Sequence, residues 1–332
     1  MPKSMNALIM LAILVSYAPS SSQASEGALQ VVPTPLQDVR VSGDLEQRVV
    51  RAVAYLDRAG RQQLWSGFER FLTNDHTWGM WGGDWPGRTL EAYARSSLLL
   101  GRPSSSRFDE VGFGLLAHQV RDGSFPNGIP QTEEARVYHA GAGYWFGNAR
   151  AMLGLLWAYR YRPDAAPYLD AARQLGDCYD RDYFPAAETQ NPSSFWWVAT
   201  EALERLYEET GEAKYLDLAK RVAQSIPPLN PSSQHTHSYL LSLRGIAAVC
   251  QQLARDQQRE ASPAAAREIR QQLMAKVMDQ YTFFREQVMW PGGGIVEHLG
   301  DAAGHSLCYW YDEGCSVCDW LGLNLDLWRV TG

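Results

Sequence analysis

A glutamate behind a glycine-rich loop is the residue in this sequence whose setting most suits catalysis. Glu297 ends the run 290–297 (WPGGGIVE), which contains three consecutive glycines. Because glycine lets the backbone adopt tight or left-handed conformations, such a loop can approach a substrate closely. Glu297 is therefore a candidate general acid or base. A solvated loop glutamate without a catalytic role is the alternative interpretation.

The segment 311–320 (YDEGCSVCDW) brings a carboxylate and two thiols, Glu313, Cys315 and Cys318, to the start of a predicted helix. The helix dipole favours negative charge in a first turn, so a thiol there tends toward the thiolate, the form that binds metal. Zinc takes Cys, His and Glu ligands, and this cluster, with Cys308 nearby, suits it. A disulfide from Cys308 to either neighbour, or inert thiols, are the two alternatives.

A loop rich in tryptophan and glycine, 78–88 (WGMWGGDWPGR), is a candidate sugar-binding element. Indole faces are flat and apolar and carry a donor edge, which complements the C–H faces and hydroxyl rims of sugars. Trp81 and Trp85 could stack on a sugar, while Asp84 and Arg88 could bind its hydroxyls. The alternative is a structural loop whose tryptophans plug the end of the fold.

Three further residues are candidate substrate contacts. Trp145 belongs to an aromatic pair that opens a helix, although paired aromatics more often lie in a core. His237 lies in 234–238 (QHTHS), where two histidines two residues apart cannot share a helix face but could reach one ligand from a loop. His298 follows Glu297 directly. A polar loop without a ligand is the alternative for both histidines.

Helical periodicity dominates the sequence from Leu45 onward, and no convincing run of alternating strand residues interrupts it. We predict helices, listed by residue range, at about 45–73, 88–101, 107–120, 145–161, 164–180, 194–209, 212–225, 237–256, 262–287 and 313–330. The fold class is therefore all-α.

A weak internal repeat indicates how these helices pair. The sequence Tyr-Leu-Asp begins at Tyr168 and again at Tyr215, a period of 47 residues, each time after a short Pro- or Gly-containing turn. The unit is an αα-hairpin, and stacked hairpins make either an open solenoid or a closed α/α toroid. The long Trp- and Gly-rich loops favour the toroid. Because 329–332 (RVTG) repeats the turn at 208–211 (EETG), we expect a toroid that is incomplete at the C-terminus.

Composition and the N-terminus indicate an exported protein. The 332 residues are 45% hydrophobic, enough for a large core, and the net charge of −7 offers none of the basic surface that nucleic-acid binding requires. Residues 1–24 resemble a secretory signal peptide, with Lys3 before a short apolar run. We expect a leader at 25–43, one toroid domain at 44–332, secretion or transfer to the periplasm, and no membrane contact after signal cleavage. A membrane anchor is the alternative.

Five motifs occur in an order that resembles the β-L-arabinofuranosidase-like glycoside hydrolases, family 127 and its relatives. They are 81–88 (WGGDWPGR), 145–152 (WFGNARAM), 236–239 (THSY), 293–297 (GGIVE) and 312–315 (DEGC). The resemblance covers roughly residues 45–332. It implies a six-hairpin α/α barrel, zinc held by a glutamate and by a cysteine two residues later, and a glutamate acid/base. Glu313 and Cys315 match the metal ligands, Cys318 is an extra candidate ligand, and Glu297 is the candidate acid/base.

The resemblance implies retaining cleavage of a terminal β-L-arabinofuranoside, with an oligo- or polysaccharide as substrate and a zinc-bound thiolate as nucleophile. The family's nucleophile is one of two cysteines that come later in the chain, and this sequence contains no counterpart, so this piece would be inactive by itself if the chain continues. Two alternatives remain open. One is another α/α-toroid carbohydrate enzyme that needs no zinc, a glucuronyl hydrolase or polysaccharide lyase. The other is a toroid that binds carbohydrate without cleaving it.

Overall fold

The computed structural model describes residues 34–58, 64–65, 82–125, 142–183, 197–231, 235–256, 263–290, 292–299 and 314–331. Within these ranges the secondary structure is helical, and the extended pairing consists of two isolated bridges. The α-helices are α1 (Gly43–Arg58), α3 (Asp84–Leu100), α4 (Arg107–His118), α5 (Ala142–Tyr161), α6 (Ala166–Cys178), α8 (Ala199–Thr210), α9 (Ala213–Ser225), α10 (Thr236–Asp256), α11 (Pro263–Phe283) and α12 (Gly314–Thr331). The shorter elements are η1 (Leu36–Asp38), η4 (Tyr179–Tyr183) and η5 (Phe284–Val288).

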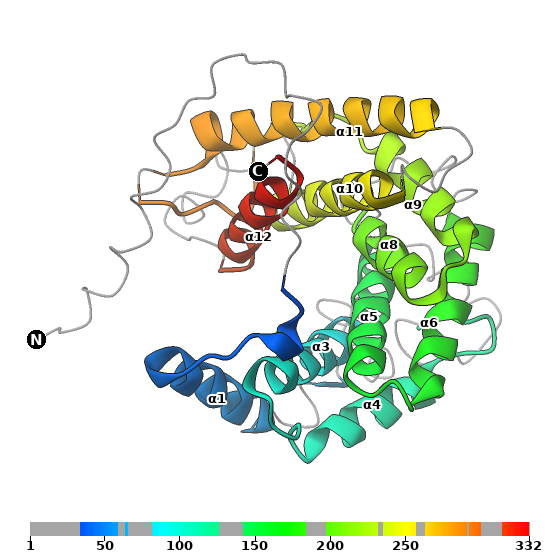
Figure 1. The fold of residues 1–332 in the computed structure, drawn as a ribbon, viewed down its shortest axis with the longest axis vertical. Coiled ribbons are helices and arrows are strands. Elements are labelled where there is room, and N and C mark those ends of the chain that lie inside the picture. Colours follow the sequence, from blue (N-terminus) through cyan, green and yellow to red (C-terminus); the bar gives the residue numbers. More distant parts are fainter. Residues whose placement is uncertain are drawn as a thin grey trace, which may run out of the picture.

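The helices alternate between an inner and an outer layer of an arc (Figure 1). Helices α3, α5, α8, α10 and α12 pack one against the next to form the inner layer, and α4, α6, α9 and α11 pack behind them. This is the α/α-toroid architecture that the hairpin repeat predicts. The signal peptide and most of the leader lie outside the described residues.

The hairpin repeat has a structural counterpart in the outer layer. Tyr168 of α6 packs over Gly112 of α4, and Tyr215 of α9 packs over Gly176 of α6. A Cβ on Gly176 would lie 2.7 Å from a ring carbon of Tyr215, so the tyrosine fills space that only glycine leaves open. Each repeat therefore contributes one aromatic ring that holds neighbouring outer helices together.

Close contact between the backbones of α3 and α5 determines how these two inner helices pack. Gly87 of α3 faces the backbone of Arg150 and Ala151 on α5, and Gly154 of α5 faces the Gly87 carbonyl. At both positions the Cβ of a larger residue would overlap with backbone atoms of the neighbouring helix. The glycines therefore bring α3 and α5 close enough for Arg88 and Arg150 to border the same space.

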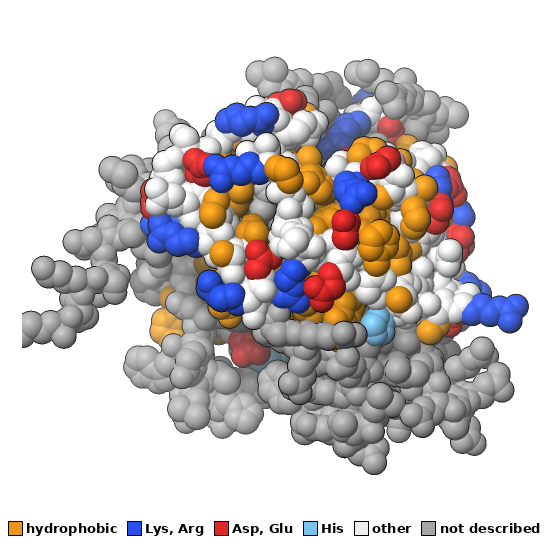
Figure 2. Space-filling model, turned by 90° about the horizontal axis from the view of Figure 1, so that it is seen from below, with side chains coloured by type: hydrophobic (Ala, Val, Ile, Leu, Met, Phe, Trp, Pro, Cys, Tyr) orange, Lys and Arg blue, Asp and Glu red, His pale blue; other side chains and the backbone are white. Residues whose placement is uncertain are grey.

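The surface seen from below the arc mixes charge of both signs with small apolar areas (Figure 2). Exposed ion pairs include Arg48–Asp44 within α1, and Arg162–Asp109, which joins the residue after α5 to α4. No helix in the described part of the chain is both long and apolar enough to cross a bilayer.

Candidate active site

The inner helices border an open cavity of about 300 Å³. Its walls come from α3, α5, α8, α10 and α12. The lining side chains are mostly charged or polar: Arg88, Glu91, Arg95, Arg150, Leu153, Glu201, His237, Leu241, Arg244, Gly314, Cys315, Cys318 and Asp319. A cavity lined by so many hydrogen-bonding side chains suits a ligand rich in hydrogen-bonding groups.

Arg88 and His237 lie at the centre of a hydrogen-bonded chain across this cavity. The Arg88 Nε donates to Asp84 Oδ1 over 2.6 Å, and its Nη2 lies 3.2 Å from His237 Nε2. A guanidinium can only donate, so His237 Nε2 accepts and His237 Nδ1 carries the proton that it donates to Asp319. The chain of contacts therefore fixes both the tautomer and the orientation of the imidazole.

The same chain continues along α12. Arg244 of α10 bonds to Asp319 Oδ1 over 3.1 Å and to Asp326 Oδ2 over 3.0 Å. Burial opposes the charge on Arg88, but the Asp84 carboxylate outweighs it and raises the Arg88 pKa above its ordinary value. Burial raises the pKa of Asp326, and Arg244 offsets part of that rise. These pairs keep buried charges compensated.

A second carboxylate, Glu91, is held between two guanidiniums on the α3–α5 side. Its oxygens lie 2.7 Å from Arg95 Nη1 and 2.9 Å from Arg150 Nη2. Burial would raise the pKa of Glu91, but Arg150 and Arg95 lower it below its usual value. Glu91 therefore stays ionised and helps to position both arginines.

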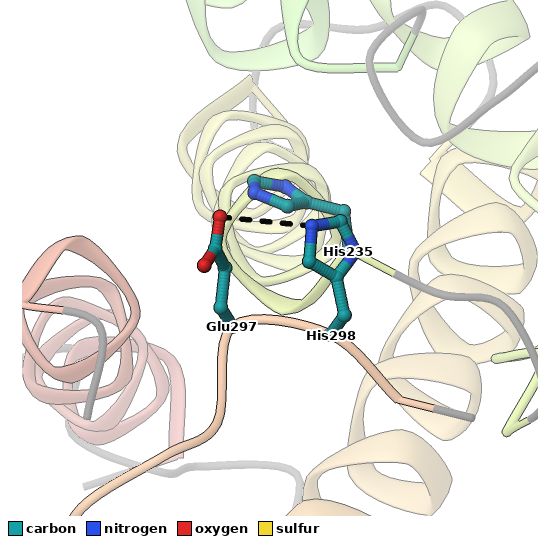
Figure 3. A group of neighbouring side chains, drawn as sticks. All are labelled: His235, Glu297 and His298. Atoms are coloured by element: carbon teal, nitrogen blue, oxygen red, sulfur yellow. Dashed lines mark ion pairs between the residues drawn. The ribbon is translucent and has the colours of Figure 1, made fainter. Parts of the chain in front are cut away.

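A separate cluster of His235, Glu297 and His298 lies beside the start of α10 (Figure 3). One donor atom from each residue lies within 4.8 Å of the other two, and His298 Nε2 is 3.6 Å from Glu297 Oε1. His235 and His298 form an antiparallel bridge, and their rings are 4.7 Å apart. Burial, followed by the neighbouring His298, lowers the pKa of His235 to about 3.

Hydrogen bonds of Thr236 connect the cluster of His235, Glu297 and His298 to residues next to the cavity. Its backbone N–H donates to the Glu297 carbonyl over 2.9 Å, and its hydroxyl contacts the Val296 carbonyl and, at 2.9 Å, Ser316 Oγ. Thr236 precedes the cavity residue His237, and Ser316 follows the cavity residue Cys315. Glu297 is therefore anchored next to the cavity rather than in a loop without contacts.

The cysteines fall into two groups. Cys178 and Cys250 are buried, and burial raises the pKa of each thiol to about 12, so both stay protonated. Cys315 and Cys318 are exposed and lie near the start of α12 at the cavity. Among the described residues, the group of three or more possible metal donors is His235, Glu297 and His298, and it includes neither cysteine.

The structure brings several of the predicted site residues together. Asp84, Arg88 and His237 are in contact, and Cys315 and Cys318 lie on the wall of the same cavity. Glu297 and His298 lie together in the adjacent cluster.

Other predicted residues lie apart or cannot be placed. Trp85 is exposed at the start of α3. Trp145 is only 2% exposed and packs between Tyr144 and Tyr179, the core position that the sequence left open as the alternative. Trp81 and Glu313 lie outside the described residues, as does Cys308.

Four residues that sequence reasoning did not select complete the arrangement: His235, Asp319, Arg244 and Glu91. A signal existed for Asp319, because it lies seven residues before Asp326 and so shares a helix face with it. The sequence indicated His235 only as the first histidine of the segment 234–238 (QHTHS). No local signal marks Arg244 or Glu91, since both resemble ordinary charges on helices.

The fold is similar to that of a solved GH127 β-arabinofuranosidase. The match has a TM-score of 0.60 and 16% sequence identity, and it covers 90% of this chain and 51% of the other. This chain therefore spans about half the length of that structure. No family model and no curated protein matches the sequence. The comparison confirms the α/α toroid and the predicted resemblance at the level of the fold.

Proposed function

We propose that this chain forms the helical part of a glycoside hydrolase that acts on an oligo- or polysaccharide. The observation that carries the proposal is a polar cavity at the inner helices, with Arg88, His237 and Asp319 fixed in its wall and Glu297 anchored beside it. Sugars offer many hydroxyls, and a cavity with both donors and acceptors complements them. The fold of the GH127 β-arabinofuranosidase supports this class.

In this proposal Glu297 is the general acid and base. As a carboxylic acid it would donate a proton to the leaving glycosidic oxygen while the cysteine thiolate that the resemblance implies bonds to the anomeric carbon. As a carboxylate it would then take a proton from the water that displaces this thiolate. The Asp84–Arg88–His237–Asp319 chain would orient the sugar through its guanidinium and imidazole edges. The resemblance in sequence motifs supports retention and a terminal β-L-arabinofuranoside as the specific substrate.

Zinc is the proposed cofactor, with Cys315, Cys318 and Glu313 as its ligands in this chain. Two exposed thiols three residues apart on α12, both at the cavity, fit the thiolate donors that zinc prefers. Bound zinc would keep a thiol ionised at neutral pH. We also propose that the protein is exported, which the N-terminal apolar segment supports, and that it binds neither nucleic acid nor membranes.

Assays of the full-length protein against glycosides with unactivated alcohol or sugar leaving groups, including β-L-arabinofuranosides, test the proposal. We expect Glu297→Gln to lower kcat/KM by about 10²- to 10⁴-fold, because it removes the transferable proton. Glu286→Gln, at an exposed glutamate of η5, is the matched control and should change the rate by less than about twofold. Equal rates for both variants would refute the assigned role.

Two further results would redirect the assignment. Full activity in chelator, unchanged by Cys315→Ser, would indicate a toroid hydrolase or lyase that works without zinc. Sugar binding that is lost in Trp85→Ala, without turnover of any glycoside, would indicate a binding protein.

A further inference from the structure

The cluster of His235, Glu297 and His298 has the geometry of an open metal site. Its three donor atoms come from two segments far apart in the sequence, the start of α10 and the loop 292–299, and all lie within 4.8 Å of one another. A tetrahedral ion about 2.0–2.1 Å from each donor would require donor separations near 3.4 Å. The measured 3.6 Å between His298 Nε2 and Glu297 Oε1 is close to that value.

The backbone holds the cluster in place without help from an ion. The His235–His298 bridge aligns the two histidines. The hydrogen bond from the Thr236 N–H to the Glu297 carbonyl fixes the backbone of Glu297 beside them. His235 Nδ1 accepts the Ser238 backbone N–H over 3.2 Å and lies 3.1 Å from Ser238 Oγ, so contacts with Ser238 fix the orientation of this ring.

The donor set selects the kind of ion. Two imidazole nitrogens and one carboxylate suit zinc and neighbouring first-row metals, whereas magnesium and calcium prefer oxygen ligands. Three protein ligands leave at least one coordination position for water or for a sugar hydroxyl.

We propose that His235, Glu297 and His298 bind one divalent transition-metal ion, at a site separate from the cysteines of α12. This site does not depend on the glycosidase assignment. If Glu297 is also the acid/base, the ion and the leaving oxygen compete for the same carboxylate, and occupancy would suppress hydrolysis.

Cobalt(II) binding to the full chain tests the proposal without any substrate. The host is the double variant Cys315→Ser, Cys318→Ser, which removes the thiols at the cavity. We expect one cobalt per chain, with visible ligand-field bands and without the intense near-ultraviolet band of a cobalt–thiolate bond. His298→Ala in this host should weaken binding at least ~10-fold, and so should His235→Ala.

His118→Ala is the control, because His118 lies on α4 with its Nδ1 at the Gly114 carbonyl, away from the cluster. It should leave cobalt affinity unchanged. Circular dichroism shows whether each variant is folded. If His235→Ala does not fold, His298→Ala alone decides the test, because the His298 side chain is 37% exposed and its removal disturbs packing little. Absence of cobalt binding by the folded host would overturn the proposal, as would a thiolate band or unchanged affinity in His298→Ala.

Discussion

The contact between α3 and α5 gives a sharp test of how the cavity is built. Gly87 lies in the first turns of α3, directly before Arg88. A Cβ added there would lie 2.5 Å from the Arg150 carbonyl oxygen, 2.7 Å from the Arg150 carbonyl carbon and 2.8 Å from the Ala151 Cα. All three are backbone atoms, so no change of rotamer can relieve the overlap, and α3 must move away from α5.

Two opposing effects decide the cost of Gly87→Ala. Alanine favours a helix over glycine by about 1 kcal/mol. Overpacking a close contact costs about 1–3 kcal/mol when side chains can adjust, and more when they cannot. Because the Cβ must retreat by about 0.9 Å to reach an ordinary contact of 3.4 Å, we expect the clash to dominate. The expected net loss is about 2 kcal/mol, or a fall in Tm of about 3 °C for a domain of this size.

Thermal and urea unfolding followed by circular dichroism measure this loss. Gly314→Ala is the matched control, since Gly314 is also helical and its added Cβ would have no atom within 4 Å. That variant should be neutral or slightly stabilised. A Tm for Gly87→Ala within about 1 °C of the control would refute the argument that the glycine sets the helix separation.

Two further predictions concern buried polar groups. Burial raises the pKa of Glu204 to about 8, so the stability it contributes is full below the ordinary pKa of 4.5 and is lost as the pH rises through 8. Glu204→Gln should therefore gain on the order of 2 kcal/mol over the wild type between pH 5 and pH 9, measured as Tm against pH, and a constant difference would contradict this. Thr236→Val removes the hydroxyl that links Val296 to Ser316 and should cost about 1–2 kcal/mol in urea unfolding. Thr282→Val, whose exposed hydroxyl bonds only within its own helix, should cost less, and equal losses would contradict the role of Thr236.

The sequence predicted the helices well because helix formation depends on local spacing. The expected ranges 164–180, 212–225 and 237–256 correspond to α6, α9 and α10. The expected helix at 262–287 covers α11 and the π-turn η5, which periodicity alone cannot separate. The Tyr-Leu-Asp repeat also predicted the hairpins correctly, since Tyr168 and Tyr215 mark the same position in successive outer helices.

The candidate site was predicted only in part, because a pattern shows which face of a helix is polar but not which residue it will meet. Asp84 and Arg88 were predicted as parts of one loop, whereas the structure places both in α3, four residues apart and in contact. The contact of Arg88 with His237 joins residues 149 positions apart and depends on how α3 and α10 are placed in the inner layer.

By itself the sequence determined the all-α class, the hairpin unit and a set of candidate residues around Glu297 and Cys315. Only the tertiary structure decided that Trp145 lies in the core, that Asp319 orients His237, and that His235 meets Glu297 and His298. The physical reason is that helices carry their own periodicity in the chain. The partners of buried charges, in contrast, are set by packing between helices, including the glycine contacts of α3 and α5.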